Sequence, residues 1–446
     1  MTYPKYRGGA IETASRAELR AYQEAKLGPL VDWVYERCPY WRKRFDERGL
    51  KPSNVRSLED LASLPYVTKA IYAESMDANP PYGEFLCSPA EEVRRKGAIV
   101  YRTTGTTGKA REFINSHDGF SHFGEQGVRN LWMAGVRPGD FVMGTFPMSL
   151  WGAGWGYYYG CRDSGITFIA GGPPYDTRAR LEIIFDYHPA AIMLTPSYAL
   201  TLARGAEEAR LDLRKSGVRA LIMGGEPFPE SRRKKIEGQW GITGGARDFS
   251  GITEGGPIYM GVECEAQDGM HFHEDFAVFE VVKIGGTDPA PPGELGEMVF
   301  TSLDQRVMGI SFHYRTGDVV RYTEEPCKCG RTSRRFKIEG RVDDMVKVRG
   351  INIFPSAVED LIRKIPELSG DFMLVLERPD DSDQVTVHVE PVPELPNQRH
   401  EEARATLEER LRRTLTIRVP VSLASPGSLP RFELKAKRWI DRRPKA

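Results

Sequence analysis

A run rich in glycine and threonine, YRTTGTTGKARE at residues 101–112, carries side chains suited to holding an anion. Its glycines let backbone N–H groups turn inward, its threonine hydroxyls add donors, and Lys109 brings a positive charge. This combination suits a polyphosphate. The run is not a Walker A motif, because only two residues separate its glycines and Ala110 follows the lysine. A flexible polar turn between strands is the alternative, and the loop alone does not decide between the two.

The composition is that of a globular protein with a small-molecule partner. Of its 446 residues, 40% are hydrophobic and 28% are charged, and Lys+Arg and Asp+Glu balance at 62 each. A chain of this length exceeds what one hydrophobic core usually covers, so we expect at least two domains. The zero formal charge gives no field that would recruit nucleic acid or a membrane surface. The sequence has neither a signal-peptide core nor a run of about 18 apolar residues, so we expect a cytoplasmic protein.

The hydrophobic pattern changes three times along the chain. Residues 1–75 show helical spacing, and residues 99–225 alternate short apolar runs with helix-like stretches, which is typical of parallel strands joined by crossover helices. Residues 270–322 alternate like antiparallel strands. We therefore predict an α/β fold in which residues 1–342 form a large N-terminal domain with mainly parallel sheets and a β-rich subdomain. Residues 343–446 are predicted to form a small, mobile α+β C-terminal domain.

Six motifs follow one another in a defined order: TTGTTGK (103–109), MGGEP (223–227), DFSGITEGG (248–256), YRTGD (314–318), GRVDDMVKVRGINIFPSAVE (340–359) and LPRFELKAKR (429–438). The series resembles that of adenylate-forming enzymes, the acyl-CoA synthetase/ligase superfamily, and more narrowly that of the phenylacetate-CoA ligase family. The resemblance covers essentially the whole chain, and six ordered motifs are far more specific than any one of them. It implies that a carboxylate attacks the α-phosphate of ATP to give acyl-AMP and pyrophosphate, and that the thiol of coenzyme A then displaces AMP.

The resemblance also implies the residues that bind ATP. The loop would grip the β- and γ-phosphates with Thr103, Thr104, Gly105, Thr106, Thr107, Gly108 and Lys109. The adenine would lie along Gly224, Gly225, Glu226 and Pro227, with further nucleotide contacts from Asp248, Phe249 and Ser250. Asp318 would accept both ribose hydroxyls through its two oxygens, and Arg341 would assist from the other side. Many relatives carry an aromatic residue at the position of Ser250, so the stacking on adenine must come from elsewhere or be weaker here.

The implied catalytic groups are Lys435, Glu254 and Thr253. Glu254 matches the magnesium-binding glutamate, since Mg²⁺ prefers carboxylate and phosphate oxygens, and Thr253 would face the α-phosphate. Lys435 matches the lysine that the small domain inserts beside the reacting carboxylate, although Lys437 would share its face in a strand. Asp343 corresponds to the hinge between the two half-reactions, and Lys347 and Gly350 to the channel for coenzyme A.

Four residues form a candidate zinc site, namely Cys264, His271, Cys327 and Cys329. Their spacing is C-x6-H followed, after a long gap, by C-x-C, and three thiolates with one imidazole are a proper tetrahedral set for structural zinc. His273 is a rival to His271. Three buried free cysteines beside a polar histidine are the alternative. Six cysteines are too few in so long a chain for a disulfide scaffold.

The segment FPMSLWGAGWGYYYG at residues 146–160 is the candidate binding site for the acid. Trp151, Gly152, Trp155 and Tyr157 could form a flat aromatic slot for a planar ring, which favours an aryl or arylacetic acid. The alternative is an aromatic-rich helix that belongs to the core. The expected partners are therefore an aromatic acid, ATP and coenzyme A, without nucleic acid or membrane, and a homodimer stays open. Transfer of the acyl group to an amine or a carrier-protein thiol, transfer of AMP itself, and nucleotide binding without catalysis are the rival functions.

Overall fold

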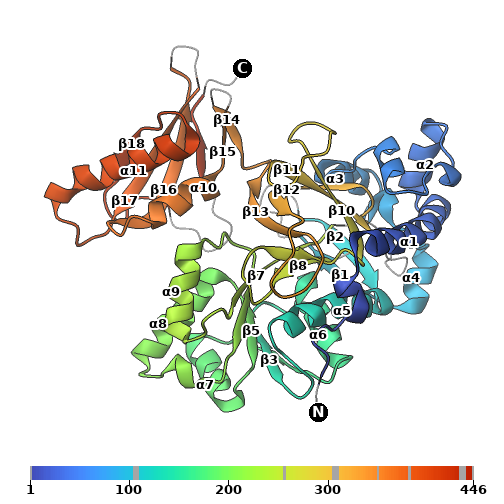
Figure 1. Ribbon diagram of the computed structural model, residues 1–446, viewed down its shortest axis with the longest axis horizontal. Coiled ribbons are helices and arrows are strands. Elements are labelled where there is room, and N and C mark those ends of the chain that lie inside the picture. The colour runs from blue at the N-terminus through green and yellow to red at the C-terminus, as the bar shows by residue number, and fades with distance from the viewer. Residues whose placement is uncertain are drawn as a thin grey trace. The chain divides into compact units, whose positions relative to one another are not determined.

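The computed structural model describes residues 3–103, 110–254, 258–303, 311–348, 351–379, 383–430 and 438–443. Its contacts divide the chain into two compact units, whose elements are labelled in Figure 1. We call residues 1–228, 232–316 and 320–337 the large unit, and residues 229–231, 317–319 and 338–446 the small unit. The predicted α/β class is confirmed. The division falls between Lys337 and Ile338, and the hinge at Asp343 with a mobile small domain stays a prediction.

The N-terminal part of the large unit is helical, as its apolar spacing predicts. Its helices are α1 (Arg16–Arg37), α2 (Pro39–Glu47), α3 (Lys69–Ala78) and α4 (Ala90–Lys96). Helix α1 begins with a capping box, in which the Ser15 hydroxyl accepts from the Glu18 N–H and the Glu18 carboxylate accepts from the Ser15 N–H. Its buried face packs into the largest core cluster through Leu27, Leu30, Val31 and Val34.

An 11-stranded sheet runs through the large unit in the order β10-β11-β12-β13-β9-β8-β7-β6-β5-β3-β4. Its parallel half consists of β3 (Phe141–Gly144), β4 (Thr167–Ala170), β5 (Ala191–Leu194), β6 (Ala220–Met223) and β7 (Ala246–Ile252). The connecting helices are α6 (Gly152–Arg162), α7 (Thr177–Tyr187), α8 (Pro196–Glu208) and α9 (Glu230–Trp240). Every residue of β5 and β6 is buried, as expected for strands covered on both faces.

The antiparallel half belongs to the same sheet, so the predicted β-rich region is not a separate layer. It consists of β8 (Ile258–Glu263), β9 (Met270–Phe272), β10 (Ala277–Val282), β11 (Leu295–Ser302), β12 (Tyr314–Thr323) and β13 (Arg335–Arg341). Strand β7 joins the halves, because it pairs with β6 in parallel and with β8 in antiparallel orientation. Stacked rings fill the core beneath these strands, with Phe272 centred 4.1 Å from Phe336 and 4.2 Å from Phe279.

The start that we expected for the parallel region, near residue 99, was wrong. Residues there form an antiparallel hairpin of their own, β1 (Ala98–Arg102) with β2 (Glu112–Ser116). Helix α5 (His117–Met133) follows directly and packs against α6. The run predicted to hold phosphate therefore lies between the two strands of a hairpin and not within the parallel sheet.

The small unit has the α+β character that its sequence predicts. Its main sheet has the order β18-β17-β16-β19, formed by β16 (Leu368–Glu377), β17 (Gln384–Pro391), β18 (Val421–Leu423) and β19 (Trp439–Asp441). Helices α10 (Pro355–Arg363) and α11 (His400–Leu415) share one core with these strands, and β14 (Val346–Val348) pairs with β15 (Ile351–Ile353).

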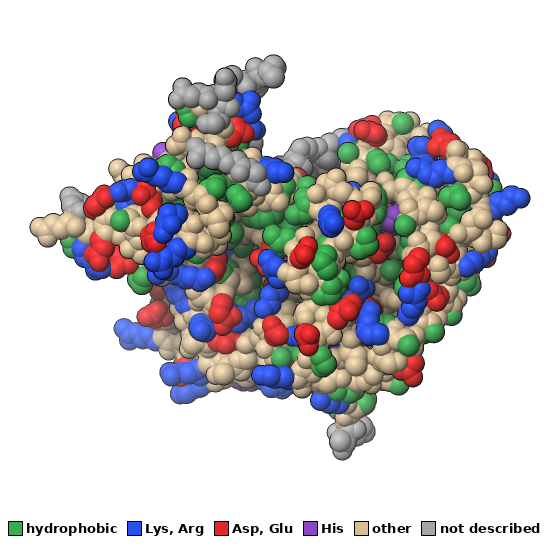
Figure 2. Space-filling model, turned by 45° about the horizontal axis from the view of Figure 1, so that its top comes forward, with side chains coloured by type: hydrophobic (Ala, Val, Ile, Leu, Met, Phe, Trp, Pro, Cys, Tyr) green, Lys and Arg blue, Asp and Glu red, His purple; other side chains and the backbone are tan. Residues whose placement is uncertain are grey.

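Charges of both signs lie interspersed over the face shown in Figure 2. This distribution agrees with the equal numbers of basic and acidic residues. Within the residues that the structure describes, none of the helices is long and apolar enough to cross a membrane.

Candidate functional site

The predicted phosphate loop is attached to the β1–β2 hairpin. The Thr103 N–H donates to the Arg111 carbonyl at 3.0 Å, and the Arg111 N–H donates to the Thr103 hydroxyl at 3.1 Å. The Arg111 guanidinium binds both carboxylate oxygens of Asp77 at 2.5 and 2.7 Å. Because the Thr103 hydroxyl accepts in this bond, its proton can still be donated to a ligand. The other predicted phosphate contacts lie outside the described residues: Thr104, Gly105, Thr106, Thr107, Gly108 and Lys109.

The predicted adenine strip follows β6 at its carboxyl end, where parallel sheets bind their ligands. Gly225 has a φ of +82°, which a side chain would strain. A Cβ on Gly224 would lie 2.6 Å from the Phe249 backbone oxygen, so the turn approaches β7 too closely for any other residue. Without side chains, these two glycines leave the backbone at the edge of the sheet accessible at the point where the adenine ring is expected.

Glu226 and Pro227 take part in contacts of their own beside this turn. The Glu226 carboxylate accepts from the Ser197 N–H at 3.0 Å and from the Ser197 hydroxyl at 2.6 Å. Ser197 lies in the first turn of α8, where a negative charge is favourable. The Pro227 carbonyl accepts from Arg232 at 3.1 Å. Glu226 thus positions α8 against the turn, and a contact between Glu226 and adenine stays a prediction.

Strand β7 carries the next predicted contacts, with Asp248 opposite Met223 of β6. Burial, and after it the neighbouring charge of Glu263, raises the pKa of Asp248 well above its usual range. Phe249 packs with ring centroids 6.2 Å from Tyr157 and 6.1 Å from Tyr259. Its ring therefore packs in the aromatic core, and the nucleotide contacts of Phe249 and Ser250 stay predictions.

Glu254, the predicted magnesium ligand, lies just beyond β7. Its side chain is 13% exposed, and Lys69 Nζ lies 4.0 Å from Glu254 Oε1. Its carboxylate accepts from the Thr253 N–H at 3.3 Å, and its carbonyl accepts from the Ser311 hydroxyl. Burial, with a further contribution from the Glu254 charge, raises the pKa of Tyr101 in β1. The partly buried carboxylate thus lies just beyond β7, beside the first residue of α3.

Lys69 is a residue that the sequence did not single out. It is the first residue of α3, next to the capping residue Thr68. Among the residues that the structure describes, Lys69 is the positively charged residue that forms an ion pair with Glu254. No motif surrounds it, so only the folded arrangement of α3 against the end of β7 reveals the pairing.

Arg341 connects the predicted ribose carboxylate and the predicted hinge residue. Its Nη1 lies 2.8 Å from Asp318 Oδ1, and its Nε lies 2.8 Å from Asp343 Oδ1. Asp318 is only 8% exposed. Gly317 has a φ of +77°, and a Cβ there would lie 2.9 Å from Arg341 Nη2. The glycine of YRTGD is therefore required both by the backbone conformation and by the passage of the arginine.

The residues predicted to act from the small unit are only partly described. Lys347 lies exposed in β14, opposite Asn352. Gly350 and Lys435 lie outside the described residues, as does the rival Lys437. Their roles stay predictions.

The candidate acid pocket is partly a core helix. Gly152 begins α6 and Trp151 is its capping residue, whose ring is centred 4.5 Å from Phe146. The Trp155 indole donates to the Ser149 carbonyl at 2.8 Å. Tyr157 is fully buried, and Asn130 donates to its hydroxyl at 3.4 Å.

Two glycines of that segment have a packing role instead of forming a slot. A Cβ on Gly156 would lie 2.3 Å from the Phe123 ring, and one on Gly160 would lie 2.3 Å from the Gly124 carbonyl oxygen. They therefore let α6 approach α5 closely. The start of the segment still borders the phosphate hairpin, because the Arg102 N–H donates to the Leu150 carbonyl at 2.7 Å.

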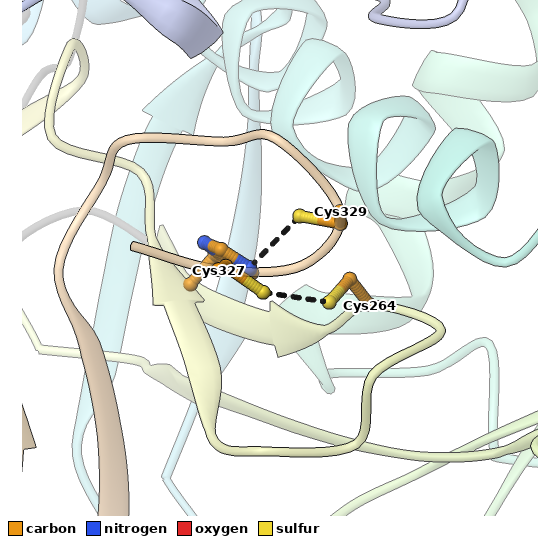
Figure 3. Close-up of side chains that lie close together, drawn as sticks. Cys264, Cys327 and Cys329 are labelled. Carbon is orange, nitrogen blue, oxygen red and sulfur yellow. Dashed lines mark hydrogen bonds between the residues drawn. The ribbon is translucent and has the colours of Figure 1, made fainter. Parts of the chain in front are cut away.

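The four predicted zinc ligands converge, as Figure 3 shows for the cysteines. Their donor atoms all lie within 4.8 Å of one another. The Cys264 and Cys327 sulfurs are 3.6 Å apart, and Cys329 Sγ lies 3.4 Å from His271 Nε2. A tetrahedral zinc ion with Zn–S bonds of about 2.3 Å requires sulfurs about 3.8 Å apart. The donor set and its spacing therefore fit zinc.

Neighbouring groups orient these ligands. The N–H groups of Ala266 and Arg331 donate to the sulfurs of Cys264 and Cys329, each at 3.4 Å. His271 Nδ1 lies 3.0 Å from the Ser333 hydroxyl, which directs Nε2 toward the sulfurs. The rival His273 is outside the group, since its Nε2 lies 2.8 Å from Asn130 Oδ1. The geometry thus favours His271.

Comparisons with known proteins agree with this arrangement. Residues 50–306 match the family described as AMP-binding enzyme, and residues 350–443 match the AMP-binding enzyme C-terminal domain. The chain is 34% identical over 443 residues to a phenylacetate-coenzyme A ligase of Aromatoleum evansii, covering 98% of this chain and 97% of that protein. It is 33% identical over 441 residues to the phenylacetate-coenzyme A ligase of Escherichia coli K12, covering 97% of each.

The fold is also found among solved structures. A 2-hydroxyisobutyryl-CoA ligase in complex with 2-HIB-AMP superposes with a TM-score of 0.87 at 28% identity, covering 99% of this chain and 93% of that one. An amide bond synthetase, McbA of Marinactinospora thermotolerans, shares the fold at a TM-score of 0.56 and 18% identity, covering 74% of this chain and 65% of that one. The motif order and the near full-length similarity lead to one conclusion: the chain belongs to the phenylacetate-CoA ligase family of AMP-binding enzymes.

Proposed function

We propose that this protein activates an aromatic carboxylic acid with ATP and transfers it to coenzyme A, giving an aryl-CoA, AMP and pyrophosphate. The observation that carries the proposal is the similarity to four phenylacetate-coenzyme A ligases, at 33–34% identity over 97–98% of this chain. The geometry supports it, because the predicted acid segment borders the hairpin that carries the phosphate loop. ATP and coenzyme A as substrates fit a reaction in the cytoplasm.

In the adenylation step the protein holds the reactants in position and neutralises phosphate charge, and it forms no covalent bond to them. Residues 103–109 would hold the β- and γ-phosphates that leave as pyrophosphate. Thr253 would donate to the α-phosphate, and Lys435 would approach the bond that forms between the acid and that phosphate. Asp318 would accept from the ribose hydroxyls with Arg341 beside it. These contacts fix the acid oxygen in line with the leaving pyrophosphate.

Glu254 fits a magnesium ion. Its carboxylate is partly buried, and its one cationic neighbour among the described ion pairs, Lys69, stays at 4.0 Å. A hard dication bound there would neutralise phosphate charge as ATP binds. Lys69 lies close enough to offset part of the carboxylate charge.

In the second step the small domain would rotate about Asp343, so that Lys347 and Gly350 line the path of the pantetheine arm. Arg341 supports this proposal, because its guanidinium is bound to Asp318 and Asp343 at once. A rotation at Asp343 would therefore change the contacts of Arg341 with Asp318 and Asp343, next to the proposed ribose site.

We also propose that Cys264, His271, Cys327 and Cys329 bind one structural zinc ion. The convergence of four donor atoms within 4.8 Å supports a closed site without an open position for a substrate. Metal analysis of protein purified without chelator should give a stoichiometry near one. A value near zero would contradict this part of the proposal.

An acid panel tests the main proposal. Aryl and arylacetic acids should support exchange between ATP and pyrophosphate, and added coenzyme A should convert them to aryl-CoA. Robust exchange without any acyl-CoA would reject the ligase and favour an amine or a carrier-protein thiol as acceptor. The likeness to the amide bond synthetase, at 18% identity, supports the shared fold alone.

A further inference from the structure

The N-terminal segment, residues 3–14, binds directly to the turn that carries two of the proposed zinc ligands. We call residues 327–333 the ligand turn. The Tyr6 hydroxyl donates to the Cys329 carbonyl at 3.0 Å. The Thr332 N–H donates to the Glu12 carbonyl at 3.2 Å, and the Thr332 hydroxyl donates to the Ala14 carbonyl at 2.5 Å. The chain start is thus attached to a turn more than 300 residues away in the sequence.

A buried charge cluster strengthens this attachment. Glu12 is 6% exposed, and its carboxylate accepts from Arg331 of the ligand turn at 2.6 Å and from the Gly8 N–H at 2.5 Å. Arg129 of α5 lies 3.8 Å from the same carboxylate and also binds Asp275 at 2.7 Å. This buried acid cannot leave its partners cheaply, because Arg331 would remain buried without its carboxylate partner, whereas Arg129 would keep Asp275.

The segment also fits the shape of the ligand turn. The Arg331 guanidinium lies 5.0 Å from the centre of the Tyr6 ring. Gly330 has a φ of +88°, and a Cβ there would lie 2.5 Å from the Tyr6 hydroxyl oxygen. The ring therefore rests on bare backbone, and any change in the conformation of the turn moves the surface on which it rests.

The conformation of the ligand turn depends on the interactions of Cys327 and Cys329 with the other two ligands, Cys264 and His271. Among the ligands themselves, the Cys264 and Cys327 sulfurs lie 3.6 Å apart and Cys329 Sγ lies 3.4 Å from His271 Nε2. Thiols form only weak hydrogen bonds. Zinc would replace these contacts by four coordinate bonds and fix the backbone that presents the Cys329 carbonyl and the Arg331 side chain.

We propose that zinc and the N-terminal segment bind cooperatively, so that an occupied cluster tightens residues 6–14 against the ligand turn and loss of the metal loosens them. This inference rests on the zinc site proposed above. Because coupling between two binding events is reciprocal, the factor by which zinc tightens the segment is also the factor by which the attached segment tightens zinc binding, although the segment contributes no ligand.

Two matched variants of the full chain test the reciprocity. Tyr6→Phe removes the hydroxyl that donates to Cys329, whereas Tyr3→Phe removes a hydroxyl of the same segment that donates to the Pro138 carbonyl at 3.5 Å. We expect Tyr6→Phe to weaken zinc binding by up to about tenfold, the equivalent of one whole hydrogen bond, in competition with a chromophoric chelator. Tyr3→Phe should bind zinc like the wild type. Glu12→Gln, measured in the same way, should weaken binding by more than Tyr6→Phe.

Hydrogen exchange of the wild-type protein tests the converse. Removing zinc with a chelator should speed exchange of the peptide covering residues 6–14, and adding zinc back should restore its protection. The cooperativity would be overturned, with the zinc site intact, if the protein holds stoichiometric zinc but both tyrosine variants bind zinc equally well and removal of zinc leaves hydrogen exchange unchanged. Absence of zinc from the wild type would overturn both. Neither measurement depends on ligase activity, so a failure of the proposed reaction is distinguishable from either outcome.

Discussion

Replacing Asp318 by asparagine tests the proposed ribose contact. A carboxylate accepts a hydrogen bond from each of two ribose hydroxyls, whereas the asparagine amide keeps a single oxygen. Losing one hydrogen bond to a charged group costs about 1.5–3 kcal/mol, which corresponds to roughly 10- to 150-fold weaker binding of ATP. The effect should be in this range because Asp318 is only 8% exposed and water cannot readily replace the lost acceptor.

The same change should leave the fold nearly intact. Arg341 loses its 2.8 Å contact with Asp318 but keeps Asp343 at 2.8 Å, so its charge is not left without a partner. The loss of stability should be about 1 kcal/mol. Asp343→Asn is the matched control, because it removes the other partner of Arg341 and keeps the carboxylate of Asp318.

Calorimetric titration with ATP, 2′-deoxy-ATP and 3′-deoxy-ATP gives the answer. The wild type and Asp343→Asn should bind both deoxynucleotides more weakly than ATP. Asp318→Asn should lose the preference for ATP over at least one of them, as expected when both partners of one contact are removed. If folded Asp318→Asn still discriminates against both deoxynucleotides as strongly as the wild type, Asp318 does not hold the ribose.

Three further changes test separate parts of the chain. Lys435→Ala should slow acyl-AMP formation at least about a hundredfold while thioesterification of supplied acyl-AMP largely survives, and equal losses in quenched-flow assays of the two steps would contradict its role. Gly224→Ala places a Cβ 2.6 Å from a backbone oxygen of β7, so it should cost about 1–3 kcal/mol in urea unfolding, unlike Gly238→Ala in α9, whose Cβ meets nothing within 4 Å. Burial raises the pKa of Glu280 to about 7, so its contribution to stability is present at pH 5 and lost as the pH rises through 7. Glu280→Gln, which keeps the size of the side chain but cannot ionise, should therefore raise the Tm at pH 8 more than at pH 5. An equal change at both values would refute this.

Much of the fold was predictable because its patterns are local. The helical spacing of residues 16–47 and the short buried runs that became β5 and β6 each reflect the environment of their own segment. The pairing of distant segments was less accessible. Nothing local distinguishes a strand of a separate hairpin from the first strand of a parallel sheet, so the expected start of the parallel region near residue 99 was wrong.

The candidate site shows the same division. The motifs predicted Asp318, Arg341 and Asp343 one by one, and the structure joins them through a single guanidinium. The aromatic segment was ambiguous, because a glycine that lets two helices touch and a glycine that opens a slot look alike in sequence. Only the distance to α5 shows that Gly156 and Gly160 serve packing.

The sequence by itself determined the family and the order of the chemical groups, because six motifs keep their spacing and residue types along one chain. The tertiary structure alone decided which groups meet. It selected His271 over His273 as the partner of three cysteines, paired Lys69 with Glu254, and attached the chain start to the ligand turn. These contacts join residues far apart in the chain, and their distances depend on how helices and strands pack, which no local pattern of residues records.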